Sequence, residues 1–549
     1  ENYPHYFTRL ASTVKNYWDK PALGNYKGEN FTFCDLATNI EKFHIFFENA
    51  GVRKGDHIAL CAKNSARWAL SFLAANTYEA VVVPILCDFL PDSIGHLVDH
   101  SESVVLFTDK EMWKKLDAEK MPAVKAVIAA NDFSLLWSRD EAFTEAFNQA
   151  DELLKAKYPA GYTAADVKFP VDNMTDLAVI NYTSGTTSSP KGVMLRYECF
   201  AASVDFATRR IPCSNNDDIV SMLPMGHIYG LVFEFMYPLC NGVHVHYLGK
   251  SPAASTLLKA VKEIKPYIVI TVPLVMEKVY KSSIKPVLDK PAMKILTSIP
   301  GISNILYKVV TKKLLDAFGG NVSQFIMGGA ALNPDVERVF RKMGLPYTVG
   351  YGMTEAAPLL AYEHPSKFVP TSCGHYVDFA EVRIDSEDPE HVAGEIQAKG
   401  MNICSGYFNN PEASANAFTD DGFLHTGDLG VMDKNGNVFI KGRSKSMILS
   451  ANGQNIYPEE LEAVINSQEF VSESVVVSRN GKLVGLLYLD EERLRKSGLA
   501  PEVISGIPEK VRVASNKLLP GYSQLAKMEV MDKPFAKTPK MSIKRFLYS

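Results

Sequence analysis

The most distinctive stretch of this 549-residue sequence is 182–192, whose residue types suit the binding of phosphate groups. Its small residues, Gly185 among them, let backbone N–H groups approach an anion closely, and Lys191 adds a positive charge. Hydroxyl donors come from Thr183, Ser184, Thr186 and Thr187. The order Pro190-Lys191-Gly192 differs from a Walker A loop, which has Gly before the Lys and Ser or Thr after it. Taken alone, a Ser/Thr/Gly tract is also typical of an ordinary surface loop.

The elements that must position this loop alternate between helices and short apolar strands. The first half of the chain predicts helices at 35–50, 65–78 and 91–100 and strands at 57–60, 81–86 and 104–108. Such alternation is typical of parallel β/α units whose sheet is covered on both faces. The pattern returns later in the chain, so we expect an α/β fold with two such units, at about 1–200 and 200–360.

After about residue 370 the pattern changes to short strands and turns. The polar residues 433–437 separate two apolar runs and predict a hairpin, so about 370–442 is expected to form a β-rich part of one large domain, 1–442. Further on, Pro458 opens a predicted helix and Asn480-Gly481 joins two more strands. We therefore expect a hinge at 443–446 and a small α+β domain at 447–549.

Composition and charge exclude several classes of protein. A hydrophobic content of 46% with 22% charged residues is typical of a folded globular chain, and 549 residues are enough for about three to four compact units. The net charge of −4 gives no basic excess that would attract nucleic acid. The eight cysteines form no Cys-x-x-Cys pair and no histidine has zinc spacing, which indicates neither a metal cluster nor a disulfide framework. No transmembrane span is predicted, and we expect a cytoplasmic protein.

Further motifs follow the 182–192 loop along the chain. They are Leu223-Pro-Met-Gly-His227, Met327-Gly-Gly-Ala-Ala-Leu332, Tyr351-Gly-Met-Thr-Glu355, Gly394-Glu-Ile396, His425-Thr-Gly-Asp428, Lys441-Gly-Arg-Ser-Lys445 and the stretch 452–462. In these motifs and their order the chain resembles the adenylate-forming superfamily, which includes acyl-CoA synthetases, firefly-type luciferases and the adenylation domains of peptide synthetases. The resemblance covers nearly the whole chain. It implies a large N-terminal adenylation domain and a small, mobile C-terminal domain.

The resemblance also implies the catalytic groups. A carboxylate is joined to AMP when its oxygen attacks the α-phosphate of ATP and pyrophosphate leaves, so charge placement supplies most of the catalysis. By resemblance, 183–191 holds the β- and γ-phosphates, Glu355 and Thr186 bind Mg²⁺, Thr354 lies near the α-phosphate and His227 lies near the acyl carboxylate. A carboxylate at a helix N-terminus is the alternative for Glu355, and an ordinary half-buried side chain is the alternative for His227.

Nucleotide and CoA contacts are implied in the same way. Asp428 is expected to accept the ribose hydroxyls with help from Arg443, although an Asp after Gly is commonly only a turn residue. The adenine site is expected to include Gly329, Ala330, Ala331 and Tyr351, and a tight strand-to-helix turn is the alternative for its small residues. Gly352 and Ile440 are expected among the other cofactor-binding residues. By resemblance, the C-terminal domain turns about Lys445 and admits the pantetheine of CoA near Gly453. The expected ligands are therefore ATP, Mg²⁺ and CoA.

The acid is expected to be a fatty acid, because 265–280 looks closest to the long-chain fatty acyl branch of the superfamily. Residues 278–313 hold eight lysines and one acidic residue, Asp289, interleaved with large apolar residues. This pattern predicts a peripheral contact with the inner face of an anionic membrane that supplies the fatty acid. A solvated lysine face over an ordinary core explains the same pattern. The sequence leaves the oligomeric state open.

The chain departs from the superfamily near its C-terminus. There the superfamily shows Lys-Thr-Pro-x-Gly-Lys, whose second Lys reaches the α-phosphate, whereas this chain has Met541 and Ser542 at the last two positions. Residues two apart in an extended backbone share a face, so we expect Lys540 or Lys544 to supply the missing ammonium group. The sequence thus predicts an ATP-dependent fatty acid:CoA ligase. An enzyme that loads an acyl carrier protein, and a nucleotide-binding regulatory pseudoenzyme without the catalytic Lys, are the alternatives.

Overall fold

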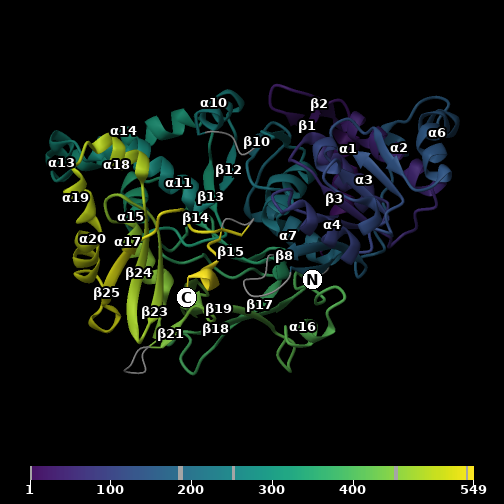
Figure 1. Cartoon of the computed structure of the whole chain (residues 1–549). Coiled ribbons are helices and arrows are strands. Elements are labelled where there is room, and N and C mark those ends of the chain that lie inside the picture. The colour runs from purple at the N-terminus through teal and green to yellow at the C-terminus, as the bar shows by residue number, and fades with distance from the viewer. Residues whose placement is uncertain (1–2, 184–189, 250–253, 450–454, 539–541, 549) are drawn as a thin grey trace.

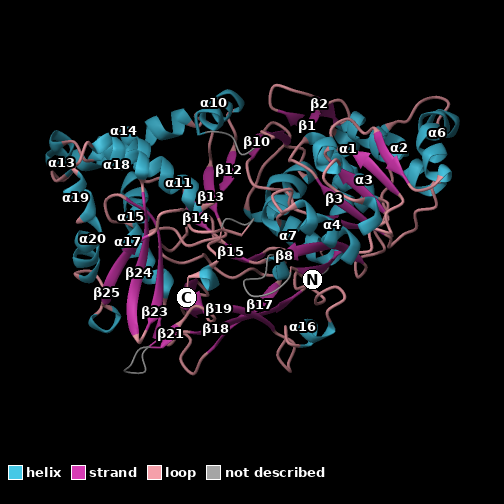
Figure 2. Cartoon of the chain, in the orientation of Figure 1, coloured by secondary structure: helices cyan, strands magenta, loops and turns pink. Residues whose placement is uncertain are grey.

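Figure 1 shows the computed structural model of the chain, which describes residues 3–183, 190–249, 254–449, 455–538 and 542–548. The N-terminal α/β region (purple and blue) lies beside a second α/β region (teal), and the C-terminal domain (yellow) lies on the far side of the second. Helices and strands are mixed throughout (Figure 2). The α/β fold with a large N-terminal and a smaller C-terminal domain, expected from the sequence, is confirmed.

The first sheet has seven strands in the order β7-β6-β5-β3-β4-β8-β9. Its parallel strands are β3 (His57–Cys61), β4 (Val81–Pro84), β5 (Val105–Thr108), β6 (Ala126–Ala129) and β8 (Leu177–Thr183), and its antiparallel edges are β7 (Leu135–Ser138) and β9 (Lys191–Arg196). The predicted helices are present as α2 (Phe33–Asn49), α3 (Ala66–Thr77) and α4 (Pro91–His100). Thr32 caps α2 through a reciprocal contact with Asp35, which fixes where that helix begins.

The second sheet also has seven strands, in the order β14-β13-β12-β10-β11-β1-β2. They are β1 (Pro21–Asn25), β2 (Asn30–Thr32), β10 (Asp218–Ser221), β11 (His244–Tyr247), β12 (Ile268–Thr271), β13 (Gln324–Met327) and β14 (Tyr347–Val349). Strand β1 pairs in parallel with β11, far away in sequence. Strands β1 and β2 thus belong to the second sheet although they precede the strands of the first sheet in the chain, because pairing depends on which sheet edge is open and not on chain order.

The helices beside the second sheet form one side of the molecule. They are α10 (Ala254–Ile264), α11 (Pro273–Val279), α12 (Lys285–Leu288), α13 (Pro291–Thr297), α14 (Ile302–Ala317) and α15 (Pro334–Met343). Other helices are α1 (Tyr6–Asn16), α5 (Lys110–Trp113), α6 (Glu141–Lys157), α7 (Tyr197–Arg210), α8 (Ile228–Gly230), α9 (Tyr237–Cys240) and α16 (Pro411–Ala415).

Two smaller sheets complete the chain. The β-rich part holds the antiparallel strands β17 (Ala380–Asp385), β18 (Gly394–Gly400), β19 (Leu424–Met432) and β20 (Val438–Arg443), with the predicted hairpin between the last two. The short pair β15 (Tyr351–Gly352) and β16 (Leu359–Ala361) lies between it and the second sheet in sequence.

The C-terminal domain has its own apolar core around β23 (Val471–Arg479), β24 (Lys482–Leu489) and β25 (Leu525–Val530). Its other elements are β21 (Ile448–Leu449), β22 (Asn455–Ile456), α17 (Pro458–Asn466), α18 (Glu491–Ser497), α19 (Pro501–Ser505) and α20 (Ile507–Asn516). Asn480 and Gly481 join β23 to β24 with φ values of 52° and 72°. Positive φ at both central residues is the backbone of a two-residue hairpin turn, as the Asn-Gly pair predicts.

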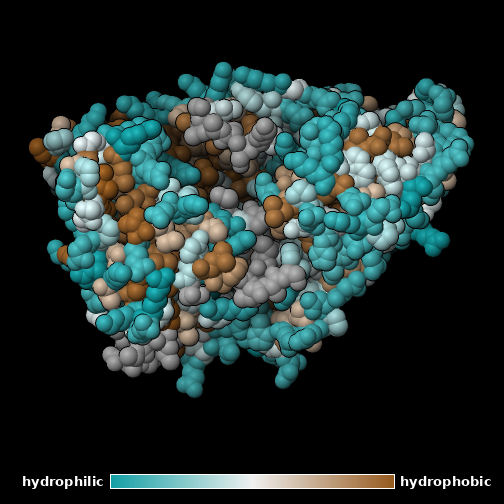
Figure 3. Space-filling model, viewed as in Figure 1, coloured by the Kyte–Doolittle hydropathy of each residue, from teal (hydrophilic) through white to brown (hydrophobic). Residues whose placement is uncertain are grey.

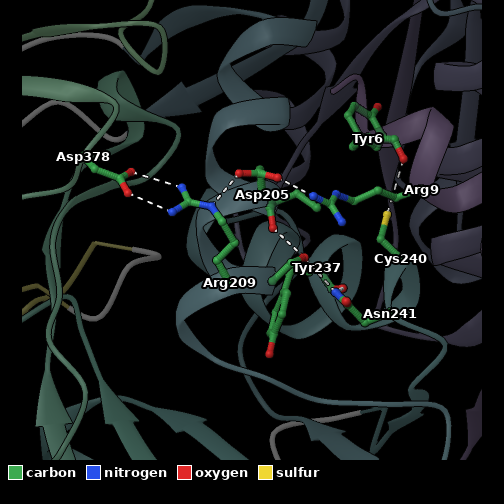
Figure 4. Close-up of polar contacts among 10 residues, drawn as sticks. Tyr6, Arg9, Asp205, Arg209, Tyr237, Cys240, Asn241 and Asp378 are labelled. Atoms are coloured by element: carbon green, nitrogen blue, oxygen red, sulfur yellow. Dashed lines mark hydrogen bonds and ion pairs between the residues drawn. The ribbon is translucent and has the colours of Figure 1, made fainter. Parts of the chain in front are cut away.

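A buried carboxylate connects α1, α7 and the β-rich part (Figure 4). Asp205 on α7 pairs with Arg9 from α1 and accepts a bond from Arg209 at 2.8 Å. Arg209 also reaches Asp378, just before β17, through two bonds of 2.9 and 3.2 Å. Planar two-point contacts of this kind fix orientation as well as distance, so they help to hold the β-rich part against the first two units.

Candidate active site

A cleft of about 2900 Å³ opens where the two large sheets, the β-rich part and the C-terminal domain meet (Figure 3). Its lining includes these residues singled out by the sequence: Thr183, Lys191, His227, Gly329, Ala330, Ala331, Tyr351, Gly352, Thr354, Glu355, Asp428, Ile440, Arg443, Lys445 and Ser542. Lys544 is described but does not line the cleft. Ser184, Gly185, Thr186, Thr187, Gly453 and Lys540 lie outside the described residues.

Lys191 and Glu355 are connected through an aromatic side chain that the sequence analysis did not identify. The Lys191 Nζ lies 5.1 Å from the centre of the Tyr407 ring, and the Tyr407 hydroxyl donates to Glu355 Oε1 at 3.0 Å. Burial raises the pKa of Tyr407, so its hydroxyl keeps its proton and remains a donor. One wall of the cleft thus carries an ammonium and a carboxylate at fixed relative positions.

Tyr407 reaches this position because 405–408 runs alongside β9. The Ser405 and Phe408 N–H groups donate to the carbonyls of Met194 and Gly192, at 3.0 and 2.8 Å. Across the other edge of β9, Thr183 is the register partner of Lys191. Thr183 and Lys191, at the two ends of this loop, are therefore anchored in a sheet, and both line the cleft.

The residues on this wall fit the Mg²⁺ expected from the sequence. Glu355 is half-buried and lines the cleft, and a carboxylate is the kind of hard oxygen ligand that Mg²⁺ prefers. The Tyr407 hydroxyl that donates to Glu355 is neutral. This hydrogen bond therefore does not neutralise the carboxylate, which can still bind a cation. Thr186, the other expected ligand, lies outside the described residues.

Asp428 is held from two sides. The Tyr351 hydroxyl donates to Asp428 Oδ2 at 2.7 Å, and Arg443 Nε lies 3.1 Å from Oδ1. Burial raises the pKa of Asp428 and the Arg443 charge opposes that shift. Each carboxylate oxygen has a second lone pair, so Asp428 can still accept hydroxyl groups from a ligand.

The small residues expected around adenine follow β13. Gly329 has a φ of 85°, a backbone conformation that glycine adopts at no steric cost. Ala330 and Ala331 come next and are exposed in the cleft. These three small residues line the same cleft as Tyr351 and occupy little of its volume, which suits a planar base.

A buried glutamate supports the loop that carries His227. Glu234, in a π-helical segment Leu231–Met236, accepts bonds from the N–H groups of Met222 and Leu223 at 3.0 and 2.8 Å and from the Ser221 hydroxyl at 3.0 Å. This contact fixes the end of β10, which leads into 222–227. Nothing in the sequence periodicity marked Glu234, since it lies within an apolar run.

We expect Glu234 to make stability depend on pH. Burial raises its pKa to about 8, so the folded state holds this proton more tightly than the unfolded chain does. Its contribution is complete below the unfolded pKa of about 4.5 and is lost as the pH rises through 8, by up to about 1.4 kcal/mol per pH unit. Urea unfolding between pH 5 and 8.5 should therefore show a falling midpoint in wild type and a flatter profile in Glu234→Gln. The exposed control Glu387→Gln should keep the wild-type profile, and equal slopes in both variants would contradict the assignment.

The described parts of the C-terminal segment, 537–538 and 542–543, pair with each other through the backbone. The Thr538 N–H donates to the Ser542 carbonyl at 2.8 Å, and Lys537 pairs with Ile543. Ser542 and Arg545 line the cleft, and Arg545 donates to Glu462 Oε1 at 2.6 Å. The pairing of 537–538 with 542–543 is not that of the single extended strand assumed from the sequence, so two-residue spacing alone does not decide which Lys faces the cleft.

Away from the charged wall the cleft continues as an apolar arm. Its lining there comes from α10, α11, α14 and the segment between them: Leu257, Val275, Met276, Val279, Ile284, Val310, Leu314 and Phe318. The same cleft therefore has a polar end, with Lys191, Glu355 and Asp428, and a hydrocarbon-lined end.

Comparison with known families agrees with this geometry. The family model described as AMP-binding enzyme matches residues 10–408, and that of the AMP-binding enzyme C-terminal domain matches 445–548. The chain belongs to the AMP-binding enzyme family. The resemblance to adenylate-forming acyl-CoA synthetases is thereby confirmed, and the protein is an AMP-forming ligase of this family.

Individual relatives act on different acids, according to their names. Long-chain-fatty-acid–CoA ligase 1 of Saccharomyces cerevisiae is 27% identical, with 86% of this chain and 74% of the relative covered. 4-Coumarate–CoA ligase 4 of Arabidopsis thaliana is 30% identical, with 82% and 75% covered. The solved structure of o-succinylbenzoate CoA synthetase from Bacillus subtilis with ATP and magnesium has a TM-score of 0.73 at 21% identity, with 99% and 98% covered. ATP and CoA, expected as ligands of this AMP-binding enzyme, are thus confirmed at the level of the family. Magnesium is named only with the solved structure of the o-succinylbenzoate enzyme, so Mg²⁺ stays a prediction for this chain.

Proposed function

We propose that this AMP-binding enzyme is an ATP-dependent fatty acid:CoA ligase. The observation that carries the proposal is the cleft with two chemically different ends. Lys191, Glu355 and Asp428 at one end suit ATP, and the apolar arm between α10 and α14 suits a hydrocarbon chain. The long-chain fatty acid ligases among the relatives support the same substrate class.

In the first half-reaction, a carboxylate oxygen of the acid attacks the α-phosphorus of ATP. The bond from that phosphorus to pyrophosphate breaks, which leaves an acyl-adenylate and pyrophosphate. We assign Lys191 and the 183–191 backbone to the β- and γ-phosphates, Thr354 to the α-phosphate and His227 to the acid carboxylate. Asp428 and Arg443 orient the ribose. When bound through Glu355 and Thr186, Mg²⁺ neutralises charge on the phosphate oxygens.

In the second half-reaction, the sulfur of CoA attacks the acyl carbonyl carbon. The bond to AMP breaks, AMP leaves, and the thiol proton passes to solvent. We assign Lys445 to the hinge about which the C-terminal domain turns and Gly453 to the pantetheine path. Gly329, Ala330, Ala331, Tyr351, Gly352 and Ile440 hold the adenine of the nucleotide through both steps.

The experiment that tests this function measures pyrophosphate release with a panel of acids. Fatty acids should support release, whereas 4-coumarate and o-succinylbenzoate should not, because their short ring systems leave the apolar arm unfilled. Loss of free thiol should follow with CoA. Thiol loss only with an acyl carrier protein would favour that acceptor instead. ATP binding without pyrophosphate release from any acid would favour the regulatory pseudoenzyme.

A membrane contact for this ligase is proposed from the outer side of α10 to α14. Large apolar side chains that do not line the cleft are exposed there: Ile295, Leu296, Ile299, Ile302 and Ile305. Leu258, Leu274, Val287 and Val309 are exposed on the same helices and line the cleft. Ile295 and Ile305 are 65% and 64% exposed, and brown atoms over α13 are visible at the left edge of Figure 3. The lysines at 278, 281, 290, 294, 308, 312 and 313 are exposed among them.

Charge and position indicate an anionic bilayer as the occupant of this face. Apolar side chains enter the headgroup boundary while lysines contact anionic lipids. Met293, Leu306 and Val309 from the same helices also line the apolar arm, so the face lies next to a path for fatty acid. Among the described residues, no helix is sufficiently long and apolar to span a membrane. A peripheral contact on the cytoplasmic face of a membrane stays our prediction.

We expect the chain to sediment with anionic liposomes at low salt and less at high salt, because screening weakens the lysine contribution. The double variant Ile295→Glu/Ile305→Glu should bind about tenfold or more weakly, because two apolar anchors are lost. The control Val392→Glu replaces an exposed apolar residue of the β-rich part and should bind like wild type. No liposome binding at low salt would leave the solvated lysine face as the explanation.

A further inference from the structure

Three side chains of metal-binding type meet on the second sheet. His244 and His246 alternate with the buried Val245 and Tyr247 along β11, so both imidazoles project from the same face of the sheet. Asp218, the first residue of β10, is the parallel register partner of His244. One nitrogen or oxygen atom from each of the three lies within 4.8 Å of the others.

These groups are close enough to share one ion. Asp218 Oδ1 lies 2.6 Å from His246 Nε2 and 3.4 Å from His244 Nδ1. The two imidazole centres are 3.9 Å apart. The side chains of Asp218, His244 and His246 are 37%, 19% and 17% exposed, which leaves a path for an ion from solvent. Small side-chain rotations would change these contacts into metal bonds of about 2.0–2.2 Å.

A second observation concerns the space beside this cluster. Gly24 on β1 is the register partner of His246, and a Cβ there would lie 2.2 Å from Asn30 Oδ1 and 3.0 Å from His244 Nε2. His244 Nε2 is buried and has no hydrogen-bond partner among the residues that the structure describes. The Asn30 amide oxygen and this His244 Nε2 therefore both lie beside Gly24. This is independent of the contacts to Asp218.

We propose that Asp218, His244 and His246 form a binding site for Zn²⁺. Two imidazoles and a carboxylate are zinc ligands, whereas Mg²⁺ and Ca²⁺ favour oxygen-only sites. Three protein ligands leave a fourth position, which a water can fill. The site is separate from the ligase chemistry, because none of the three ligands lines the cleft.

The position of the site indicates a structural role. A bound ion joins the starts of β10 and β11, two neighbouring strands of the second sheet. Strand β10 then leads into 222–227, whose first residues are held by Glu234. An ion that binds the folded chain and not the unfolded chain stabilises the folded state, so Zn²⁺ should raise the thermal unfolding midpoint.

The test is a titration of the metal-free full chain with Zn²⁺, followed by calorimetry and metal analysis. We expect one Zn²⁺ per chain. The affinity for Zn²⁺ should fall by about a hundredfold or more in His246→Gln and in Asp218→Asn, because each variant loses a direct ligand. The control His391→Gln removes a histidine from an exposed His–Asp pair, 3.1 Å apart, and should bind like wild type. Circular dichroism establishes that each variant is folded.

Co²⁺ absorption gives a second measurement, which also serves if one variant fails to fold. Co²⁺ at a site with two imidazoles should give a visible spectrum that Zn²⁺ abolishes and that His244→Gln or Asp218→Asn changes. If the chain does not bind Zn²⁺ stoichiometrically, His244 and His246 only share Asp218 as a hydrogen-bond acceptor and form no metal site. Undiminished binding in all the ligand variants would place the ion elsewhere. Either result overturns the proposal.

Discussion

Replacing Lys191 or Glu355 by alanine is expected to lower pyrophosphate release by about a hundredfold or more. The adenylation transition state carries negative charge on the phosphate oxygens and on the attacking carboxylate. Lys191 supplies a fixed ammonium on the wall of the cleft, and Glu355 on the same wall is the proposed Mg²⁺ ligand. Fixed charges of this kind stabilise the transition state by several kcal/mol, so both variants should lose rate rather than only substrate affinity.

Tyr407→Phe provides a graded comparison on the same wall. It keeps the ring beside Lys191 but removes the hydroxyl that donates to Glu355, so we expect a loss of about tenfold. The matched control Lys168→Ala removes an exposed lysine that does not line the cleft and should leave the rate unchanged. Pyrophosphate release close to wild type from both Lys191→Ala and Glu355→Ala would reject the assignment of this cleft to adenylation.

The second large effect concerns Ser542. A neutral hydroxyl cannot replace an ammonium beside an α-phosphate that an anionic carboxylate attacks. We expect Lys540→Ala or Lys544→Ala to lower pyrophosphate release at least about tenfold. Lys540 is the first choice, because the other candidate, Lys544, does not line the cleft. Thioester formation from supplied acyl-adenylate should stay largely intact in both variants, because in the proposed mechanism that step uses the other face of the C-terminal domain.

The converse change separates compensation from a fold effect. Ser542→Lys, added to whichever alanine variant is impaired, should restore pyrophosphate release, because it returns an ammonium to a position that lines the cleft. Lys533→Ala, in the same domain, should behave like wild type. Normal adenylation in both Lys540→Ala and Lys544→Ala would show that neither lysine replaces the missing one.

Local elements were predictable from the sequence wherever the signal involves neighbouring residues. The Asn480-Gly481 turn, the hairpin at 433–437 and the helix that begins at Pro458 are all present. Backbone preferences of Asn, Gly and Pro decide such features within a few residues, so no distant contact is needed.

Contacts between distant segments were not predictable in this way. The pairing of β1 with β11 and the passage of 405–408 beside β9 join residues far apart in sequence. Tyr407 was therefore missed, although it lies between Lys191 and Glu355 in the site. The His244-x-His246 pair was missed because its spacing has meaning only once β11 is known to be a strand with Asp218 beside it.

The sequence by itself determined the chemistry available to this protein: a hydroxyl- and glycine-rich loop with Lys191, the acidic residues Glu355 and Asp428, the motif order of an AMP-binding enzyme, and Ser542 in place of a lysine. Residue types and local spacing are sufficient for these, because they depend on the chain alone. Only the tertiary structure decided that the described parts of these motifs line one cleft, that this cleft has an apolar arm, and that Tyr407, Glu234 and Asp218 lie where they do. Those facts depend on which strand edges pair and which side chains are buried together, and both are set by packing of the whole chain.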